Sequence, residues 1–356
     1  MKIKKQRPRK IYLNCKYIPP ELFAAAGFIP FRPWSEKIGE FGRDLLPYDF
    51  CPYTRSFLST VIENSDQDRN YTVFAASCDG MRRAYDATEK SIIIDVPRYL
   101  TEDKTDYYYR QLCKILKELD IDYNKSWYKE KLFNMIIKYN QQRRLLQKLR
   151  IQLSLPKEKS FFLLLKAIKN YYFQHKVEEI KVLTENVSSA TEKNNVSKAH
   201  TGSHFCIPRI LISSSCLLDS SVIELIDNKK LKIVGLDSCF GERTFNFQVN
   251  TNKEDPLYCL ARDYMRGPLC PRMMNPDRRL QEVNKMVETR EIDGIIYFTP
   301  KFCDQASYDF KLLHDSKLLD IPLLKLEGEY RAGDSGQINT RITAFAEALM
   351  INKKGI

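Results

Sequence analysis

Residues 71–77 read YTVFAAS and residues 91–95 read SIIID, and both are short apolar runs of the kind that form buried β-strands. Between further runs, SSVIELIDNKK and RRLQEVNKMVETREID have the spacing of amphipathic helices. Because continuous apolar runs that alternate with helices are typical of parallel sheets covered on both faces, we expect an α/β fold with two doubly wound domains. The further runs are RILIS (209–213), LKIVGL (231–236), GIIYFT (294–299) and PLLKL (322–326).

The length of 356 residues supports two domains, because a single hydrophobic core rarely extends so far. We expect an N-terminal α/β domain over 1–124 and a C-terminal α/β domain over 205–356. Between them, residues 125–183 combine helical spacing with many Lys and Arg residues, which predicts a basic helical region. The stretch TENVSSATEKNNVSKAHTGSH (184–204) is polar and lacks periodicity, so it is interpreted as a linker.

The net charge of +12 is concentrated in the first ten residues and in the segment 125–181. Such a segment can face nucleic acid, a polyphosphate or an acidic partner, but a solvated Lys-rich helix surface is the more ordinary interpretation. No run of about 18 apolar residues occurs, so no membrane-spanning helix is expected. The basic start has no apolar core behind it, which argues against a secretory signal and predicts a cytoplasmic protein.

The ten cysteines are the most informative residues of the chain. Disulfides are not expected in a cytoplasmic protein, and no two cysteines have the C-x-x-C spacing of a zinc ribbon or a ferredoxin loop. Several predicted strands nevertheless run into a cysteine, and the carboxyl ends of parallel strands border the functional crevice of an open α/β sheet. These thiols could converge on a metal or cluster, or they could be small buried residues. They are Cys78, Cys216, Cys239 and Cys303.

The other cysteines differ in their context. Cys51 and Cys270 each precede a predicted helix, whose amino terminus would stabilise a thiolate. Cys113 and Cys259 lie within predicted helices and are interpreted as packing residues. No partner pattern accompanies the remaining two, Cys15 and Cys206.

Around these cysteines the sequence resembles the 2-hydroxyacyl-CoA dehydratase D-component family, which also includes benzoyl-CoA reductase cluster subunits and double-cubane cluster proteins. The matching stretches span almost the whole chain in the right order, and jointly they are specific. They are YIPPELFAAAGFIPFRP (17–33), CPYTRSFLSTVIEN (51–64), FAASCDGMRRAYD (74–86), LDSCFGERTF (236–245), GPLCPRM (267–273), DGIIYFTPKFCD (293–304) and LEGEYRAGDSGQINTRITAFAE (326–347).

This resemblance implies two Rossmann-like domains with an iron–sulfur cluster in the cleft between them. By motif, the ligands of a 4Fe–4S cluster would be Cys51 of C-P-Y-T-R, Cys78 of S-C-D and Cys303 of K-F-C-D. Three thiolates on a cubane leave one iron open to an oxygen or substrate ligand.

The family also implies an activity and partners. A lyase of this kind works in anaerobic metabolism and removes water from a 2-hydroxyacyl-CoA through a radical, as a dimer of homologous or identical subunits. A separate ATP-dependent iron–sulfur activator would supply the single electron. The absence of a P-loop motif from this sequence agrees with that division of labour.

Two other functions stay open. Cys239 and Cys270 exceed the needs of one cubane and are similar to the double-cubane members, which hold an 8Fe–9S cluster and reduce small molecules; Cys216 is a candidate for a sixth ligand. The third function is a non-catalytic basic binding protein that uses residues 125–181. No recognised nucleic-acid motif is present, so nucleic acid is not the expected partner.

Three arginines within the matching stretches are candidate substrate-binding residues. Arg82, Arg83 and Arg243 could bind acyl-CoA phosphates or offset the charge of a cluster, because a guanidinium matches the geometry of a phosphate. Surface ion pairing is the alternative for each of them.

Overall fold

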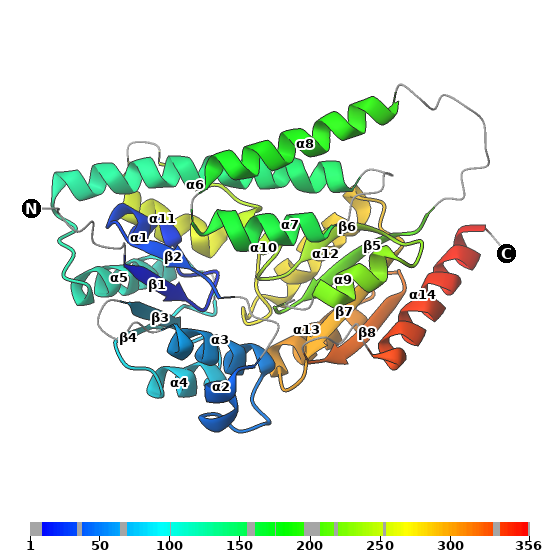
Figure 1. The fold of residues 1–356 in the computed structure, drawn as a ribbon, viewed down its shortest axis with the longest axis horizontal. Helices are drawn as coiled ribbons and strands as arrows, with labels where there is room; N and C mark the ends of the chain where they lie inside the picture. The colour runs from blue at the N-terminus through cyan, green and yellow to red at the C-terminus, as the bar shows by residue number, and fades with distance from the viewer. Residues whose placement is uncertain are drawn as a thin grey trace, which may run out of the picture.

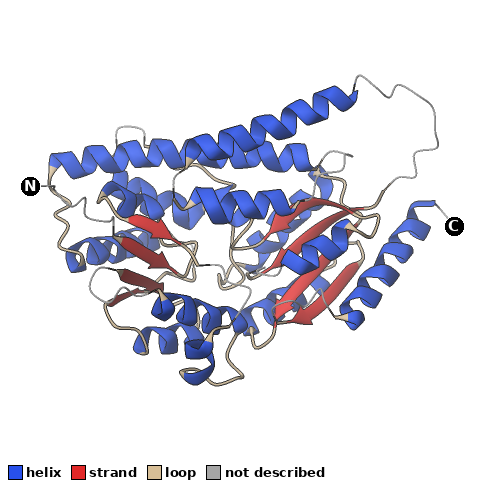
Figure 2. Ribbon diagram, in the orientation of Figure 1, coloured by secondary structure: helices blue, strands red, loops and turns tan. Residues whose placement is uncertain are grey.

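The computed structural model describes ten stretches of the chain, and everything below concerns these residues. Each half of the chain forms an α/β unit, and the two sheets lie side by side (Figure 2). The described residues are 9–33, 38–64, 70–99, 101–154, 161–174, 176–195, 207–216, 220–251, 254–329 and 335–354.

The N-terminal half builds a parallel sheet from β1 (Lys10–Leu13), β2 (Ile29–Phe31), β3 (Tyr71–Ala75) and β4 (Ser91–Ile94), in the order β2-β1-β3-β4. The apolar runs predict β3 and β4 correctly but do not predict β1 and β2. The strand β1 (KIYL) lies in the basic start of the chain, and β2 has only three residues, one of which is Pro30. A proline is tolerated there because β2 is an edge strand.

The C-terminal half repeats this arrangement with β5 (Arg209–Ser214), β6 (Lys232–Asp237), β7 (Gly294–Pro300) and β8 (Leu323–Gly328), in the order β6-β5-β7-β8. All four strands coincide with predicted runs. In each sheet the second strand lies on one side of the first strand and the third strand lies on the other side. Both halves therefore have the same doubly wound topology, and the predicted pair of Rossmann-like units is confirmed.

Helices flank both sheets (Figure 1). In the N-terminal half these are α1 (Pro20–Ala25), α2 (Glu40–Asp44), α3 (Pro52–Glu63), α4 (Asp79–Asp86) and α5 (Glu102–Glu118). In the C-terminal half they are α9 (Ser220–Asp227), α10 (Glu242–Phe245), α11 (Pro256–Arg266), α12 (Pro276–Thr289), α13 (Asp304–His314) and α14 (Gly336–Lys354).

The connecting region is helical, as predicted, and consists of α6 (Ser126–Leu153), α7 (Phe162–Ala167), the π-helical turn η1 (Ile168–Tyr172) and α8 (Val177–Asn195). The structure differs from the predicted linker over residues 184–195, which continue α8.

The reason for the longer helix is its buried face. Ile180, Thr184 and Val187 recur at helical spacing and are all buried, so this polar stretch still presents a narrow packing stripe. The last nine residues of the predicted linker, 196–204, lie outside the described residues.

Helix α6 spans both halves of the molecule (Figure 1). Leu132 and Ile136 pack in the core that contains Val73 of the first sheet, whereas Leu146 packs in the core that contains Ile212 of the second sheet. One continuous helix thus contributes side chains to both cores, which ties the two units together along one edge.

A buried polar triad reinforces this junction. Arg143 of α6 donates to Glu21 of α1 at 2.5 Å and to the Tyr264 hydroxyl of α11 at 2.8 Å, and the Tyr264 hydroxyl donates to Glu21 at 2.7 Å. Helix α11 follows β6 in the sequence, yet its Leu257 and Leu260 belong to the core of the first sheet. The C-terminal half of the chain therefore helps to build the N-terminal unit.

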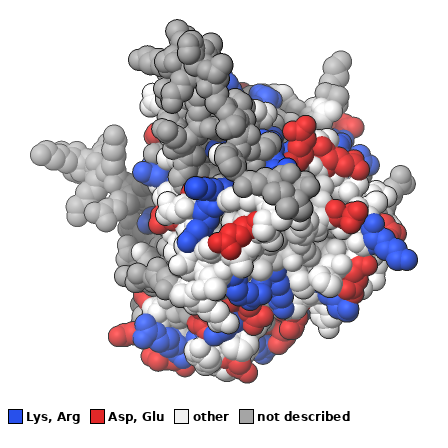
Figure 3. All heavy atoms as spheres, turned by 90° about the vertical axis from the view of Figure 1, so that its right-hand side faces the viewer, with Lys and Arg blue, Asp and Glu red and all other residues white. Residues whose placement is uncertain are grey.

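Part of the predicted basic region is paired inside the molecule. Lys129 lies 3.5 Å from Asp255 and Arg150 lies 3.8 Å from Glu242. On the face shown in Figure 3, beside the second sheet and α14, Lys and Arg side chains alternate with Asp and Glu side chains. Within the described part of the chain, no helix is both long and apolar enough to cross a membrane.

Candidate functional site

Cysteines follow the two central strands of each sheet. Cys15 comes two residues after β1 and Cys78 three residues after β3; in the second sheet Cys216 comes two residues after β5 and Cys303 three residues after β7. In each pair the strands are neighbours and the chain winds away from them in opposite directions. Such a switch point at the carboxyl ends of parallel strands is where open α/β sheets bind ligands.

The structure brings Cys51, Cys78, Cys216 and Cys303 together, and we name them the first thiol group. Cys51 shares side-chain hydrogen bonds with both Cys216 and Cys303. Cys78 interacts electrostatically with Cys51 and Cys303. The three cysteines of the C-P-Y-T-R, S-C-D and K-F-C-D motifs therefore converge, although Cys51 and Cys78 come from one half of the chain and Cys303 from the other.

Three cysteines of the first thiol group each lie at the amino terminus of a helix. Cys51, Cys78 and Cys303 are the N-cap residues of α3, α4 and α13. Backbone N–H groups at the start of a helix lack intrahelical partners and carry partial positive charge. At Cys78 the backbone of Gly80 and Met81 lowers the pKa of the thiol, but burial outweighs this effect.

The thiols of the first group raise one another's pKa. The hydrogen bond with Cys216 raises the pKa of Cys51 far above that of an ordinary thiol, and the bond with Cys51 does the same to Cys303. Burial raises the pKa of Cys78. Several buried thiols packed together favour the neutral form, and a bound cationic metal would reverse this preference.

A second set of thiols lies beside the first. Cys239 and Cys270 have their sulfur atoms 3.9 Å apart, Cys15 interacts electrostatically with Cys239, and all three are buried. We name these the second thiol group. Sequence analysis singled out Cys239 and Cys270 but not Cys15, because β1 was not predicted and Cys15 therefore showed no strand end.

The second thiol group is surrounded by buried cations. Lys16, Arg32 and Arg272 are all less than a tenth exposed. Arg32 donates to the Cys239 carbonyl at 2.6 Å, and Lys16 donates to the carbonyl of Pro268. The Nε atoms of Arg32 and Arg272 have no hydrogen-bond partner within the described residues, which leaves donor capacity for an anion.

The buried cations and the contact between the two sulfurs shift the pKa values of Cys239 and Cys270. A hydrogen bond from Cys270, together with Arg243, Arg32 and Lys16, lowers the pKa of Cys239 to about 5, and the same bond raises the pKa of Cys270. Burial lowers the pKa of Lys16 to about 8. The second thiol group therefore holds a thiolate at neutral pH, in contrast to the first.

One residue joins the two thiol groups. The hydroxyl of Ser215 lies 3.3 Å from the Cys303 sulfur, and the Ser215 carbonyl accepts a hydrogen bond from the Cys239 N–H at 3.2 Å. The two groups are therefore neighbours at the junction between the sheets.

The arginines predicted for substrate binding occupy different places. Arg82 and Arg83 are exposed on α4, and Arg83 pairs with Asp86 at 2.7 Å. Arg243 is buried and fully engaged, because it donates twice to Asp237, at 2.6 and 2.7 Å, and once to the Ser214 carbonyl at 2.7 Å. Arg243 thus supports the sheet edge and the charge balance around Cys239.

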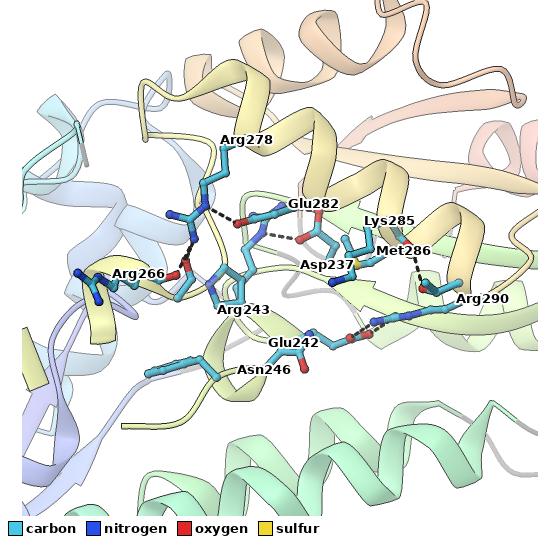
Figure 4. A pocket seen from close by; sticks show the side chains of 14 residues that line it. Asp237, Glu242, Arg243, Asn246, Arg266, Arg278, Glu282, Lys285, Met286 and Arg290 are labelled. Carbon is cyan, nitrogen blue, oxygen red and sulfur yellow. Dashed lines mark hydrogen bonds and ion pairs between the residues drawn. The ribbon is translucent and has the colours of Figure 1, made fainter. Parts of the chain in front are cut away.

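A cavity of about 330 Å³ lies on the other side of Arg243, between α10, the end of α11 and α12 (Figure 4). Its charged lining is largely paired: Arg290 lies 2.6 Å from Glu242 and Arg278 lies 3.0 Å from Glu282. None of the described cysteines is among its lining residues, so this cavity is separate from both thiol groups.

The sulfurs of the two thiol groups are not arranged as the ligands of a single metal ion. No group of three His, Cys, Asp or Glu side chains among the described residues is arranged to hold one metal ion. A single ion needs its sulfur ligands at about 2.3 Å, whereas the ligands of a multi-iron cluster bind different metal atoms. The two packing residues, Cys113 on α5 and Cys259 on α11, take no part in either thiol group.

Fold and site together define a two-unit α/β protein whose paired switch points carry converging thiols. The chain belongs to the 2-hydroxyglutaryl-CoA dehydratase D-component family (HGD-D), which matches residues 15–349. The predicted family resemblance is therefore confirmed, and with it a protein of the 2-hydroxyacyl-CoA dehydratase type.

Similar proteins include dehydratase subunits from bacteria. The chain is 24% identical to YjiM of Escherichia coli (strain K12), named as a candidate dehydratase subunit, over 94% of this chain and 90% of that protein. It is 21% identical to the (R)-phenyllactyl-CoA dehydratase beta subunit of Clostridium sporogenes, with the same coverage. It is 25% identical to the beta subunit of (R)-2-hydroxyglutaryl-CoA dehydratase from Acidaminococcus fermentans, over 40% of this chain and 38% of that protein.

Proposed function

We propose that this protein is the iron–sulfur subunit of a 2-hydroxyacyl-CoA dehydratase, with a 4Fe–4S cluster held by Cys51, Cys78 and Cys303. The observation that carries the proposal is the convergence of these three thiols from both halves of the chain. Family membership supplies the substrate class, an acyl-CoA thioester with a hydroxyl group.

The residues of the first thiol group suit this role. All three proposed ligands are helix N-cap residues, and the partial positive charge of a helix amino terminus would offset the negative charge of thiolate-bound iron. When bound, the cluster would supply a single low-potential electron that makes the loss of water from the substrate possible. Cys216 and Ser215 adjoin the three ligands and would occupy the remaining side of the site.

Partners follow from the similar proteins. Two of them are named beta subunits, so we propose that this chain pairs with a homologous or identical subunit. An ATP-dependent activator protein would deliver the electron. All nine described cysteines are free thiols, which suits a reducing compartment such as the cytoplasm.

The second thiol group favours a second candidate function, a double-cubane reductase of small molecules. Cys15, Cys239 and Cys270 supply three more thiols next to the first group. The buried cations Lys16 and Arg32 would balance the added negative charge of an 8Fe–9S cluster. Cys15 is thus a candidate for the sixth ligand of such a cluster, beside the sequence-based candidate Cys216.

Anaerobic purification followed by iron and sulfide analysis and electron paramagnetic resonance tests both functions. About four irons per chain support the dehydratase, and about eight support the double cubane. Cys51→Ala, Cys78→Ala and Cys303→Ala should each abolish the chromophore, whereas the matched control Cys113→Ala should retain it. Cys15→Ala should lower the iron content only if the second thiol group binds iron. Full iron content in Cys303→Ala would contradict the ligand assignment.

A further inference from the structure

The first thiol group is assembled from two halves of the chain, which are joined through shared cores and also by contacts beside the thiols, such as the Tyr53 ring on Phe240 and Arg32 on the Cys239 carbonyl. Cys51 and Cys78 belong to the N-terminal half, whereas Cys216 and Cys303 belong to the C-terminal half. Helices α6 and α11 join the halves through their cores. A further contact that lies directly beside Cys51 and Cys303 can constrain the spacing of the thiols across the junction.

Such contacts surround the carboxylate of Glu329, directly after β8. The hydroxyl of Tyr48 donates to Glu329 Oε1 at 2.8 Å, and Lys301 Nζ lies 3.3 Å from the same oxygen. The Arg55 guanidinium lies 3.6 Å from Glu329 Oε2. Tyr48 and Arg55 come from the N-terminal half, so one carboxylate of the C-terminal half binds two side chains of the other half.

Aromatic contacts reinforce the same junction. The rings of Tyr48 and Phe302 meet edge to face, with centroids 6.0 Å apart, and the Arg55 guanidinium lies over the Tyr48 ring at 4.9 Å. A second polar contact crosses nearby, because Gln305 of α13 donates to the Ser77 carbonyl at 2.5 Å. These groups form one continuous contact between the halves.

The contact is coupled to the thiols through very short segments. Tyr48 precedes Cys51 by three residues, and Phe302 directly precedes Cys303. Phe302 has a φ angle of +58°, in the left-handed region that aromatic residues rarely adopt. Such a conformation persists only where the surrounding contacts impose it, and here it directs the ring toward Tyr48 and fixes the start of α13.

We propose that Tyr48, Arg55, Lys301, Phe302 and Glu329 form an interdomain clasp that sets the spacing between Cys51 and the thiols of the C-terminal half. These are positioning residues. The clasp serves the same thiols as the proposed function and in that sense rests on it. Its test uses the iron-free protein, so failure of the clasp and failure of the cluster assignment are distinguishable.

The test is the rate of disulfide formation in the reduced, iron-free, full-length protein treated with diamide. Each disulfide releases two electrons and two protons, which the diazene bond of diamide takes up. Peptide mapping measures the disulfides that join Cys51 to Cys303 or Cys216. The Cys239–Cys270 pair, whose sulfurs are 3.9 Å apart, oxidises in the same sample and serves as the internal reference.

In Tyr48→Ala we expect the disulfides of Cys51 to form about tenfold more slowly relative to the reference pair. The reason is that this variant loses one hydrogen bond to a charged carboxylate and one ring contact. Tyr48→Phe should show a smaller decrease, because it keeps the ring, and Glu329→Gln should retain part of the rate. Tyr308→Ala, on the exposed surface of α13, is the matched control and should leave both rates unchanged.

An unchanged or faster rate at Cys51 in both Tyr48→Ala and Phe302→Gly would overturn the proposal. If disulfide formation slows equally at Cys51 and at the Cys239–Cys270 pair in Tyr48→Ala, the variant has destabilised the whole fold. The rate measured in Tyr48→Phe then decides whether the clasp exists. A normal Cys51 rate in Tyr48→Phe and in Glu329→Gln would in that case reject the clasp.

Discussion

At the scale of single residues, Asp237 lies at the centre of a buried network of charged side chains. It accepts hydrogen bonds from Arg243, Arg279 and Ser213, while Arg279 also binds Asp309 at 2.9 Å. All of these side chains are buried. Burial alone would raise the pKa of Asp237, but Arg243 and Arg279 hold it well below its usual range. The charges of Arg243 and Arg279 thus balance those of Asp237 and Asp309, close to the second thiol group.

Asp237→Asn should therefore be strongly destabilising. It leaves a buried positive charge uncompensated, and we expect a loss of about 3–5 kcal/mol in the free energy of unfolding, measured with urea. Because the native pKa of Asp237 is depressed, its contribution is complete above about pH 4 and declines below it, so the gap to the unchanged protein should narrow in acid.

The control for this prediction is the exposed ion pair between Arg83 and Asp86, whose side chains are about half exposed. Asp86→Asn should change the free energy of unfolding by less than about 0.5 kcal/mol. Equal changes in the free energy of unfolding in Asp237→Asn and Asp86→Asn would show that the buried network stabilises the fold no more than an exposed ion pair does.

Cys239 gives a second prediction for single residues. In the reduced, iron-free protein, one thiolate should be detected by its ultraviolet absorbance at neutral pH and should disappear as the pH falls through about 5. Arg32→Gln should move this transition to higher pH, because it removes a nearby cation. Absorbance that first rises at about pH 8, where ordinary thiols titrate, would show that Cys239 is not activated.

The motifs of the family resemblance grouped Cys51, Cys78 and Cys303, whereas the strand-end pattern grouped Cys78, Cys216 and Cys303 with Cys239 and left out Cys51. Cys51, Cys78 and Cys303 directly precede helices, and Cys78 and Cys303 also follow recognisable strands. Cys15 escaped because its strand, KIYL, begins with a lysine in the basic start of the chain and has no long continuous apolar run. The cations around Cys239 could not be predicted, since Lys16 and Arg32 belong to the N-terminal half and reach it only across the folded junction.

At the scale of elements, the packing of α14 on β7 depends on a glycine. A Cβ atom at Gly294 would lie 2.9 Å from Phe345 and 3.1 Å from Leu349, both on α14. Gly294→Ala should displace the helix and cost about 1–3 kcal/mol of stability in thermal or urea unfolding.

Gly336, the first residue of α14, is the matched control, because a Cβ atom there meets no atom within 4 Å. Gly336→Ala should be neutral or slightly stabilising. If Gly294→Ala were equally harmless, the close approach of α14 to β7 would be relaxed in solution.

Element prediction succeeded where burial was continuous and failed where it was sparse. The strands of the second sheet are long apolar runs, and β7 is buried along its whole length. Helix α8 was missed in part because only a narrow stripe of its side chains is buried, which leaves the polar composition of a linker.

At the scale of the whole molecule, the two units share core side chains that come from distant parts of the sequence. The apolar side chains of α11 complete the core of the first sheet, and α6 contributes to both cores. The division at residues 124 and 205 follows the order of strands but cuts through shared cores. Contacts of this kind connect residues more than a hundred positions apart, which local patterns do not encode.

Residues 205–356 expressed alone should therefore fail to fold cooperatively. Leu257 and Leu260, both fully buried in the complete chain, would become exposed. We expect binding of a hydrophobic dye and a broad thermal transition, whereas the full-length chain should unfold sharply. Co-expression with residues 1–204 is the control and should restore a sharp transition. A cooperative transition in the isolated fragment would contradict the shared core.

The splitting of the first thiol group between the halves has a consequence for biosynthesis. On the ribosome, Cys51 emerges early, but its partner Cys303 emerges only when most of the polypeptide has been made. A nascent chain that has released only β1–β4 presents Cys51 and Cys78 without the opposing wall of their pocket. Loading of any inorganic group that requires all three sulfurs must therefore wait until the segment with Cys303 has also been made and has packed against the N-terminal unit.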